Sequence, residues 1–433
     1  YGKNPQTDPI QVFWDENLTQ PAVQPIRTIN GYYSRYGTPS RVFIQGLSCS
    51  ITVKDKYRTL VYSELRTSGK VAGLINASVI LDASGLTQQQ INNTVTRNVK
   101  FPVDLLSINN PIESQVVSVI SVNQDYTYLP ESIEPENGVT VVGKWVMNTP
   151  DAYYASWFAE KDIVIDQSAK IQTGGDYAVS KGRPYIVDGA FHVEANQGYQ
   201  GIDNNAFIVR DNAMITFLPS ARFVQINQNK NQSNIMLCMR TKNFSIISPV
   251  LIGDRLDNMA LGHTSDAQGY GYGLTLYEAQ DGYVFEPKCS QNHGDNIYIG
   301  KPWGSNQDLL PKNITIVRPK CDHARRSCIS LTSWDNVKII DPVVSYGGDS
   351  DGIIGAFPKC GIDVELENAP NFTLSQGYAG VITNPIFNNC TNGLFVYSSY
   401  DNRNFDIHVQ GITTFNSVSV IGLGLFHGSA NNT

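Results

Sequence analysis

A short pattern that recurs between residues 243 and 397 constrains the fold of this chain more than any other feature. In each copy an Ile or Val stands three positions before a proline, and a short apolar strand follows later. From Pro287 to Ile297 there are ten residues, and from Ile329 to Pro342 thirteen, so the basic unit has 23 residues. Longer gaps fall at only two points of the unit, after the proline and after the strand, which is how loops are inserted into a solenoid. The five prolines are Pro249, Pro287, Pro319, Pro342 and Pro385.

Three columns of the repeat are apolar throughout. In the third column apolar residues alternate with other residues, and this period of two is typical of β-strands. A 23-residue unit with two or three short strands matches a parallel β-helix, whose rungs are about 4.8 Å apart. The leucine-rich repeat is the rival, but its signature is absent. The columns are Ile246, Val284, Ile316, Ile339 and Ile382; Leu251, Cys289, Cys321, Val344 and Phe387; and Leu274, Ile297, Ile329, Ile362 and Leu394.

The composition argues against nucleic-acid binding and against insertion into a membrane. The 433 residues carry a net charge of −7, and charged residues make up only 16%. No concentrated basic run is present, so nucleic acid is not expected as a partner. No run of eighteen apolar residues is present, and we therefore expect no membrane insertion.

The seven cysteines predict buried thiols rather than disulfides, because they lie mostly in or beside apolar columns. Reduced thiols indicate folding in a reducing cytoplasm. A zinc site built from Cys289, Cys321, His293 and His323 would lack CxxC spacing. The acidic run at 349–352 has no closing Glu that would make a calcium loop. We therefore predict neither a metal nor a cofactor.

The first 66 residues read as short strands broken by turn residues. The segments Thr7–Asn17 (TDPIQVFWDEN) and Gln24–Tyr32 (QPIRTINGY) resemble the head-binding domain of short-tailed phage tailspikes. Gly31 directly follows Asn30 here, which departs from the pattern of that family. The first strand of such a domain would precede Tyr1, so we expect residues 1–66 to form an incomplete adaptor domain.

Residues 67–150 are expected to form a connector with a short helix near 87–95, where Thr87 and Gln90 are spaced as a capping box. The next segments, Tyr153–Phe158 and Asp166–Gln172, resemble the start of the pectate-lyase-like β-helix domains of phage depolymerases. In those domains a helix plugs the open end of the solenoid, which otherwise exposes apolar rungs and strand edges. We expect this helix near 162–181, in a β-helix domain that spans 151–433.

Together these resemblances imply a bacteriophage tailspike. The fold they imply is all-β, a right-handed parallel β-helix preceded by a small β-rich adaptor domain. They further imply a homotrimer in the virion tail, assembled in the host cytoplasm. Its N-terminal domain would bind phage tail or head connector proteins, and its β-helix a bacterial surface polysaccharide.

The outward positions of the repeat strands carry the candidate chemistry. Aromatic platforms combined with acids are what a glycan-binding groove requires. Asp363 and Glu365 lie two apart on one strand, so their Cα atoms are about 6.5–7 Å apart. Both the retaining and the inverting arrangement of glycosidase carboxyl groups therefore remain open. Their repulsion would raise the pKa of one carboxyl group, giving an acid and a base near neutral pH. The alternative is an ordinary solvated β face. The two outward columns are Thr275, Tyr298, Ser330, Asp363 and Phe395, and Tyr277, Gly300, Thr332, Glu365 and Tyr397.

A second cluster combines Asp322, Arg325 and Arg326 with Asp295, one rung earlier. The arginines could bind an acidic sugar or hold a carboxylate in its charged form; a structural salt bridge is the alternative. The candidate catalytic residues are therefore Asp363, Glu365, Asp322 and Asp295. The candidate substrate-binding residues are Tyr277, Tyr298, Trp303, Arg325, Arg326, Tyr346 and Tyr397.

Three functions remain open. The first is endo-acting hydrolysis of O-antigen or capsule by Asp363 and Glu365. The second is a polysaccharide lyase, which needs a base and a cation that neutralises the uronate, such as Arg325, Arg326 or Lys301. The third is a receptor-binding adhesin without catalysis. Their products differ: a lyase makes a new double bond, a hydrolase makes only new reducing ends, and an adhesin makes neither.

Overall fold

The computed structural model describes residues 10–29, 32–36, 38–44, 48–55, 57–68, 97–226, 232–260, 262, 269–302, 309–350, 352–366, 377–398, 405–417 and 421–425. Contacts divide the chain into two compact units, Tyr1–Thr149 and Pro150–Thr433. The short helix expected near 87–95 lies outside the described residues. No helix within the described ranges is long and apolar enough to cross a bilayer.

The first unit is built from short strands. The hairpin of β7 and β8 is its longest pairing, with Val53 opposite Tyr62. A second group within the unit pairs β9 in parallel with β10, while β11 to β13 are antiparallel. The elements are β1 (Val12–Phe13), β2 (Pro21–Ala22), β3 (Thr28–Ile29), β4 (Tyr32–Arg35), β5 (Thr38–Pro39), β6 (Phe43–Ile44), β7 (Ser48–Lys54), β8 (Leu60–Ser68), β9 (Arg97–Val99), the 3-10 helix η1 (Pro102–Ser107), β10 (Val116–Val119), β11 (Gln124–Tyr128), β12 (Val141–Val142) and β13 (Trp145–Met147).

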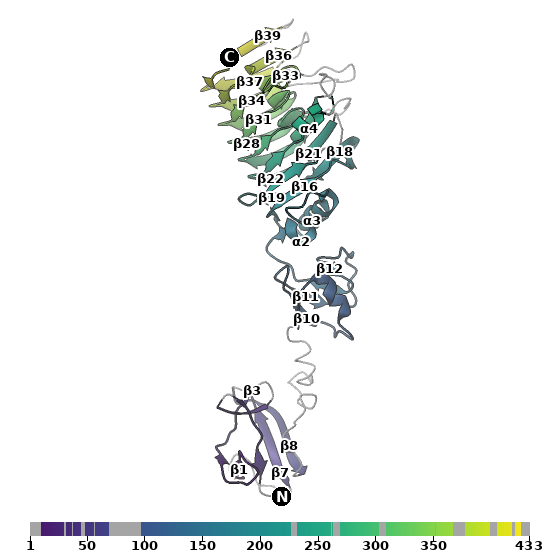
Figure 1. Ribbon diagram of the computed structural model, residues 1–433, viewed down its shortest axis with the longest axis vertical. Helices are drawn as coiled ribbons and strands as arrows, with labels where there is room; N and C mark the ends of the chain where they lie inside the picture. Colours follow the sequence, from purple (N-terminus) through teal and green to yellow (C-terminus); the bar gives the residue numbers. More distant parts are fainter. Residues whose placement is uncertain are drawn as a thin grey trace. The chain divides into compact units, whose positions relative to one another are not determined.

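The second unit is a parallel β-helix, as expected from the repeat (Figure 1). Each rung contributes one strand to each of three long sheets, which we number in chain order. Sheet 1 consists of β14 (Tyr153–Tyr154), β15 (Tyr185–Val187), β19 (Met214–Phe217), β22 (Lys242–Ile247), β25 (Gln280–Phe285), β28 (Lys312–Val317), β31 (Trp334–Ile340), β34 (Gly377–Thr383) and β37 (Phe405–Gln410).

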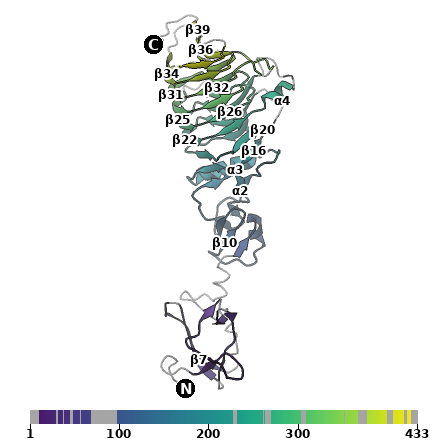
Figure 2. The same cartoon turned by 60° about the vertical axis from the view of Figure 1, so that its left-hand side comes forward.

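Sheets 2 and 3 also stack in parallel, except that β17 pairs antiparallel with β18 at the start of sheet 3. A short helix, α4 (Arg255–Ala260), stands beside the stack (Figure 2). Sheet 2 consists of β16 (Ala190–Val193), β20 (Arg222–Gln225), β23 (Val250–Ile252), β26 (Lys288–Ser290), β29 (Lys320–Asp322), β32 (Val343–Ser345), β35 (Ile386–Asn388) and β38 (Thr413–Phe415). Sheet 3 consists of β17 (Gln197–Tyr199), β18 (Ile202–Ile208), β21 (Gln232–Met239), β24 (Tyr270–Tyr277), β27 (Ile297–Gly300), β30 (Ser327–Leu331), β33 (Cys360–Leu366), β36 (Asn392–Ser398) and β39 (Ile421–Leu425).

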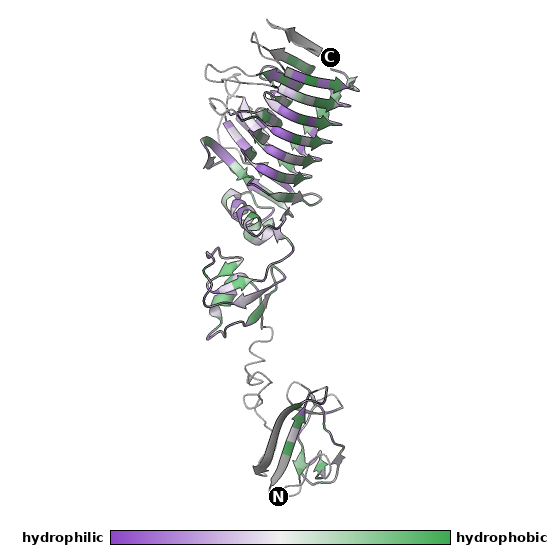
Figure 3. Cartoon of the chain, turned by 180° about the vertical axis from the view of Figure 1, so that it is seen from behind, coloured by the Kyte–Doolittle hydropathy of each residue, from purple (hydrophilic) through white to green (hydrophobic). Residues whose placement is uncertain are grey.

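The centre of the core is formed by the three predicted columns, one from each sheet, and further buried residues such as Leu276 and Ile299 add to it. In sheet 3 Leu274 pairs with Ile297, and the series continues through Ile329 and Ile362 to Leu394. The columns of sheets 1 and 2 are in register in the same way. All these side chains are buried, and apolar segments follow one another from rung to rung (Figure 3). Burial of each such side chain contributes about 1.5–3 kcal/mol.

The corner between sheets 1 and 2 is the same in six consecutive rungs, from β22–β23 to β37–β38. Two residues separate the strands at each of these corners. The first has a positive φ between 48° and 73°, and in five of the six corners the second is a repeat proline. The other two corners of the rung, which flank sheet 3, accept all the long insertions. The six first residues are Ser248, Glu286, Arg318, Asp341, Asn384 and Gly411.

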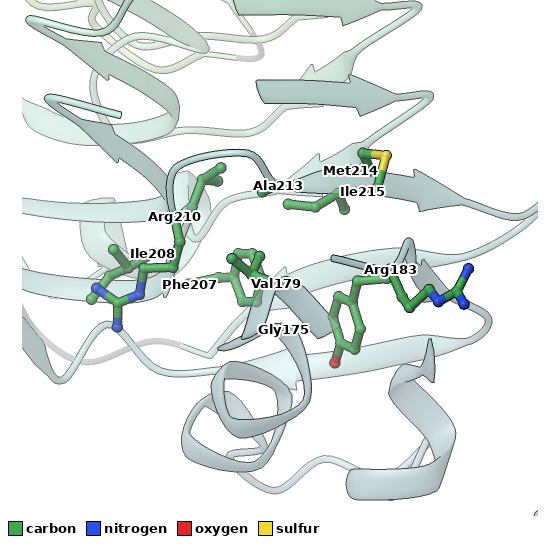
Figure 4. A pocket seen from close by; sticks show the side chains of 11 residues that line it. Gly175, Val179, Arg183, Phe207, Ile208, Arg210, Ala213, Met214 and Ile215 are labelled. Carbon is green, nitrogen blue, oxygen red and sulfur yellow. The ribbon is translucent and has the colours of Figure 1, made fainter. Parts of the chain in front are cut away.

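A helix covers the N-terminal end of the solenoid, as the resemblance implied. After α2 (Ala155–Phe158), α3 (Ser168–Ser180) lies inside the range expected for it. The Gln172 amide donates to Ile208 O (3.0 Å), and Ile208 N donates to Gln172 Oε1 (2.7 Å), so this side chain completes the backbone bonding at the end of β18 that β17 does not reach. Gly175 permits close contact, because a Cβ there would lie 2.8 Å from the Phe207 ring. The cavity left between α3 and the first rungs, about 10 Å³, is the size of one water (Figure 4).

Six cysteines are buried free thiols: Cys238, Cys289, Cys321, Cys328, Cys360 and Cys390. Burial raises the pKa of the Cys238, Cys321 and Cys328 thiols well above the ordinary value. Thiols of this kind are unreactive, since the thiolate is the reactive form. They therefore act here as small apolar core residues.

Candidate functional site

The candidate site lies on the outward face of sheet 3. The outward column is in register from Thr275 through Tyr298, Ser330 and Asp363 to Phe395. The sequence predicted an open face, but Thr275 (0%), Ser330 (1%) and Asp363 (1%) are almost inaccessible. This face is therefore a covered polar layer, where charges are poorly hydrated and interact strongly.

The carboxyl groups of Asp295, Asp363 and Glu365 interact electrostatically with one guanidinium in this layer, that of Arg326. Arg326 directly precedes β30, Asp295 lies just before β27, and Asp363 is on β33. Arg326 Nη1 lies 3.5 Å from Asp295 Oδ2, and the Arg326 side chain is 14% exposed. Burial opposes the positive charge, yet the negative charges of Asp295 and Asp363 and the nearby Tyr272 raise the pKa of Arg326. Arg326 is therefore a permanent cation that partly balances the acids.

Asp295 is the most deeply buried member of this cluster, with no exposed surface. Its Oδ1 accepts a hydrogen bond from the backbone N–H of Ser327 (2.9 Å). Burial raises the pKa of Asp295, while Arg326, the Ser327 N–H and the Ser330 hydroxyl partly offset the rise. Asp295 is thus held in a fixed position with a weakened tendency to ionise.

Glu365 is the accessible acid of the cluster, because it is half-buried where Asp363 and Asp295 are fully buried. Burial raises its pKa, Arg326 lowers it, and the negative charge of Asp295 raises it. A raised carboxyl pKa keeps a larger share of the proton near neutral pH, as a general acid requires. The structure therefore gives Glu365 and the two aspartates different environments.

The two arginines predicted for substrate binding point to different places. Arg326 joins the acid cluster and lies over the Tyr270 ring, with Cζ 5.3 Å from the ring centroid. Arg325 is completely buried, and its Nη1 lies 3.4 Å from His293 Nε2. Arg325 therefore lies behind the candidate site, where it has no surface for a ligand.

The tyrosines predicted as stacking platforms form part of the covered layer. Tyr298 is 2% exposed and Tyr277 is 8% exposed. The Tyr298 ring lies 4.9 Å from Tyr272 and 5.4 Å from Tyr277, in a cluster with Leu237 and Met239. In this arrangement they support the floor of the site and offer little surface to a sugar.

The remaining candidates lie apart from this cluster or outside the described residues. Asp322 Oδ2 is 2.7 Å from His323 Nδ1, and the His323 ring stacks on Tyr346 at 4.4 Å. These three form a separate group at the corner between sheets 2 and 3. Trp303 and the side chain of Tyr397 lie outside the described residues. In the described part of the chain, no group of three or more His, Cys, Asp or Glu side chains is placed to hold a metal ion.

Two residues of the site were missed in the sequence. Tyr270 and Tyr272 begin β24, where Tyr270 contacts Arg326 and Tyr272 packs on Tyr298. The signal was present in the run Gly269-Tyr270-Gly271-Tyr272-Gly273. Large side chains two apart with glycines between them place both tyrosines on one face of a strand.

Comparison with known proteins supports the fold. No protein-family model matches the chain, and a search of the curated proteins gives no match. Among solved structures, the chain is similar to the tailspike gp49 of Acinetobacter baumannii bacteriophage Fri1, a capsular polysaccharide depolymerase. The TM-score is 0.52 with 13% identity, and the match covers 75% of this chain but only 65% of that one.

Two further tailspikes are similar at lower scores. The gp42 tailspike of Acinetobacter phage vb_AbaP_AS12 has 11% identity and a TM-score of 0.42, with coverage of 74% of this chain and 56% of that one. The enzymatically active domain of tailspike protein 2 of bacteriophage CBA120 has 14% identity and a TM-score of 0.43, with coverage of 75% and 53%. The parallel β-helix fold implied by the sequence resemblance is confirmed by the sheet topology and by the similarity to gp49.

Proposed function

We propose that this chain binds a bacterial surface polysaccharide, O-antigen or capsule, and cleaves it by endo-acting hydrolysis. The observation that carries this proposal is the cluster of Asp295, Asp363 and Glu365 around Arg326 on a covered face of the β-helix. Its fold likeness to a capsular polysaccharide depolymerase supports the choice of substrate class. Hydrolysis of a glycosidic bond needs two carboxyl groups in different roles, and in this cluster Asp363 is buried while Glu365 is half-buried.

In the proposed reaction Glu365 donates a proton to the leaving glycosidic oxygen. It is the carboxyl group that a polymer can reach, and burial raises its pKa. Asp363, two residues earlier on the same outward face, is the partner that activates water or attacks the sugar carbon; because it is 1% exposed, the side chains that cover it must move when the polymer binds. Arg326 stabilises the negative charge of the partner, and Asp295 holds Arg326 in place. With one group as acid and another as base, the protons balance in each turnover.

The same proposal places the chain in a phage tail. The N-terminal unit would bind phage tail or head connector proteins, and three copies would assemble into a homotrimer in the host cytoplasm. These assignments follow from the resemblance to tailspikes. Crosslinking followed by mass measurement of the purified protein tests the trimer, and a monomer at micromolar concentration would contradict it.

The test of function is product analysis on purified capsules and O-antigens from a panel of Gram-negative strains. We expect new reducing ends without absorbance from a new double bond, and we expect Glu365→Gln to remove the cleavage but keep the binding. The matched control is Glu286→Gln, since Glu286 forms an exposed ion pair with Arg318 (2.9 Å) at the corner between sheets 1 and 2. A double bond in the product would identify a lyase, and binding without any product would identify an adhesin; either result overturns hydrolysis.

A further inference from the structure

We infer that Phe357, supported by Phe395, forms a stacking subsite for an uncharged sugar ring beside the acid cluster. This inference rests on the proposed function and adds to it the position and the chemistry of one bound sugar. Neither ring was among the substrate-binding residues predicted from the sequence.

The first observation is the exposure of Phe357. Its side chain is 62% exposed, whereas Phe191, Phe223 and Phe387 of the same unit are completely buried. Phe415 is exposed as well, at 56%, so the exposure of Phe357 is informative only together with its neighbours: an accessible ring beside polar groups offers an apolar surface that the C–H face of a sugar can cover. The ring packs edge to face on Phe395, with centroids 6.0 Å apart and planes at 81°, and Phe395 is only half-buried. The two rings therefore form a small apolar surface, which we call the apolar step.

The second observation is the connection between this step and the acids. Arg326 Nε donates a hydrogen bond to the backbone oxygen of Phe357 (3.1 Å), so the cation of the cluster holds the chain that carries the ring. Phe395 is the register partner of Asp363 on the adjacent strand. Neighbouring strands are about 4.8 Å apart. A sugar stacked on this step would thus lie about one residue of a polysaccharide away from Asp363 and Glu365.

The chemistry of the rings selects the ligand. A phenylalanine ring has no hydrogen-bonding group, so it recognises the C–H face of a pyranose by contact alone. The acids next to it outnumber the guanidinium of Arg326 by three to one. Arg326 is already paired with Asp295, so it is not available to pair with a uronate. The subsite therefore fits a neutral sugar with a flat C–H face.

The experiment compares Phe357→Ala, Phe357→Leu and Phe357→Tyr on the polysaccharide of the panel that the wild-type protein cleaves. We expect KM to rise about tenfold for the Ala and Leu variants, a factor in keeping with the loss of part of an aromatic contact. The Tyr variant retains a flat ring and should stay within about twofold of wild type. The control is Tyr283→Ala, because Tyr283 is also exposed (41%) and packs on an aromatic ring, Phe285, but lies in sheet 1.

The outcomes separate this inference from the proposed function. Cleavage with an unchanged KM in the Ala variant, or equal rescue by Leu and Tyr, would refute the stacking subsite and leave hydrolysis intact. Absence of cleavage and binding across the whole panel by the wild-type protein would overturn both. Binding of the same polysaccharide to Glu365→Gln with and without Phe357→Ala gives the affinity directly. An equal affinity in that pair would also refute the subsite.

Discussion

Replacing Arg326 with Met should destabilise the β-helix in a way that depends strongly on pH. Asp295 has no exposed surface, and Arg326 is the cation beside it, at 3.5 Å. Removal of one partner of a buried ion pair leaves an uncompensated charge and typically costs about 3–5 kcal/mol. With an m-value of about 3 kcal/mol/M, a loss of about 3 kcal/mol lowers the urea midpoint by about 1 M.

The sign of the pH dependence follows from the pKa of Asp295, which burial raises above its unfolded value. A raised folded-state pKa means that stability is fully present below the unfolded pKa, about 3.9, and is lost as pH rises through the folded pKa. Arg326 holds the pKa of Asp295 down, so its removal extends this loss to higher pH. It affects Glu365 in the same direction. The penalty should therefore nearly vanish at about pH 4 and approach its full value at about pH 8.

The assay is urea unfolding followed by far-ultraviolet circular dichroism at both pH values. The double variant Arg326→Met/Asp295→Asn removes the uncompensated charge. At the higher pH its urea midpoint should therefore return most of the way to the wild-type value. Wild type, the two single variants Arg326→Met and Asp295→Asn, and the double variant together form a double-mutant cycle that measures the interaction energy of the pair. A destabilisation of equal size at both pH values, or a double variant as unstable as Arg326→Met, would show that the pair does not balance charge as described.

Three further predictions concern the site, the cap and the core. If Glu365 is the proton donor, kcat/KM of the wild-type enzyme should fall as pH rises through the raised pKa of Glu365. Glu365→Gln should lower kcat about 10²–10⁴-fold, and kcat/KM of this variant should no longer fall at high pH. A pH profile of wild-type shape in that variant would contradict the assignment. Gly175→Ala should lower the free energy of unfolding by about 1–3 kcal/mol, because the new methyl group would lie 2.8 Å from the Phe207 ring. An unchanged melting temperature would mean that α3 packs loosely on the first rungs. Ile329→Ala should cost about 2–5 kcal/mol, since Ile329 lies in the middle of the buried column of sheet 3; unaltered urea unfolding would be inconsistent with that packing.

The inward side of the solenoid was predictable because stacking imposes one simple rule. Side chains such as Ile316 and Ile339 face each other across adjacent strands, so the same apolar type recurs at the same position of each unit. The recurrence can be read without a structure. The positive φ of Arg318 before Pro319 could not be read in this way, since arginine carries no preference for that conformation.

The outward side was predictable only in part, because its environment depends on loops that differ from rung to rung. The sequence placed Asp363 and Glu365 on one face, and the structure adds that Asp363 is buried while Glu365 is reachable. Arg325 and Arg326 are adjacent and chemically identical. Only the path of the chain at this corner directs one to His293 and the other to Asp295.

The constant corner between sheets 1 and 2 has a consequence for how such a chain can change. It repeats one two-residue turn, with non-glycine residues such as Ser248 and Glu286 held at positive φ, at roughly 1–2 kcal/mol each. Because this corner is constant in six consecutive rungs, the two corners that flank sheet 3 can gain, lose or exchange segments without altering the stack. Segments inserted at these two corners can therefore change in length and sequence while the core columns stay the same.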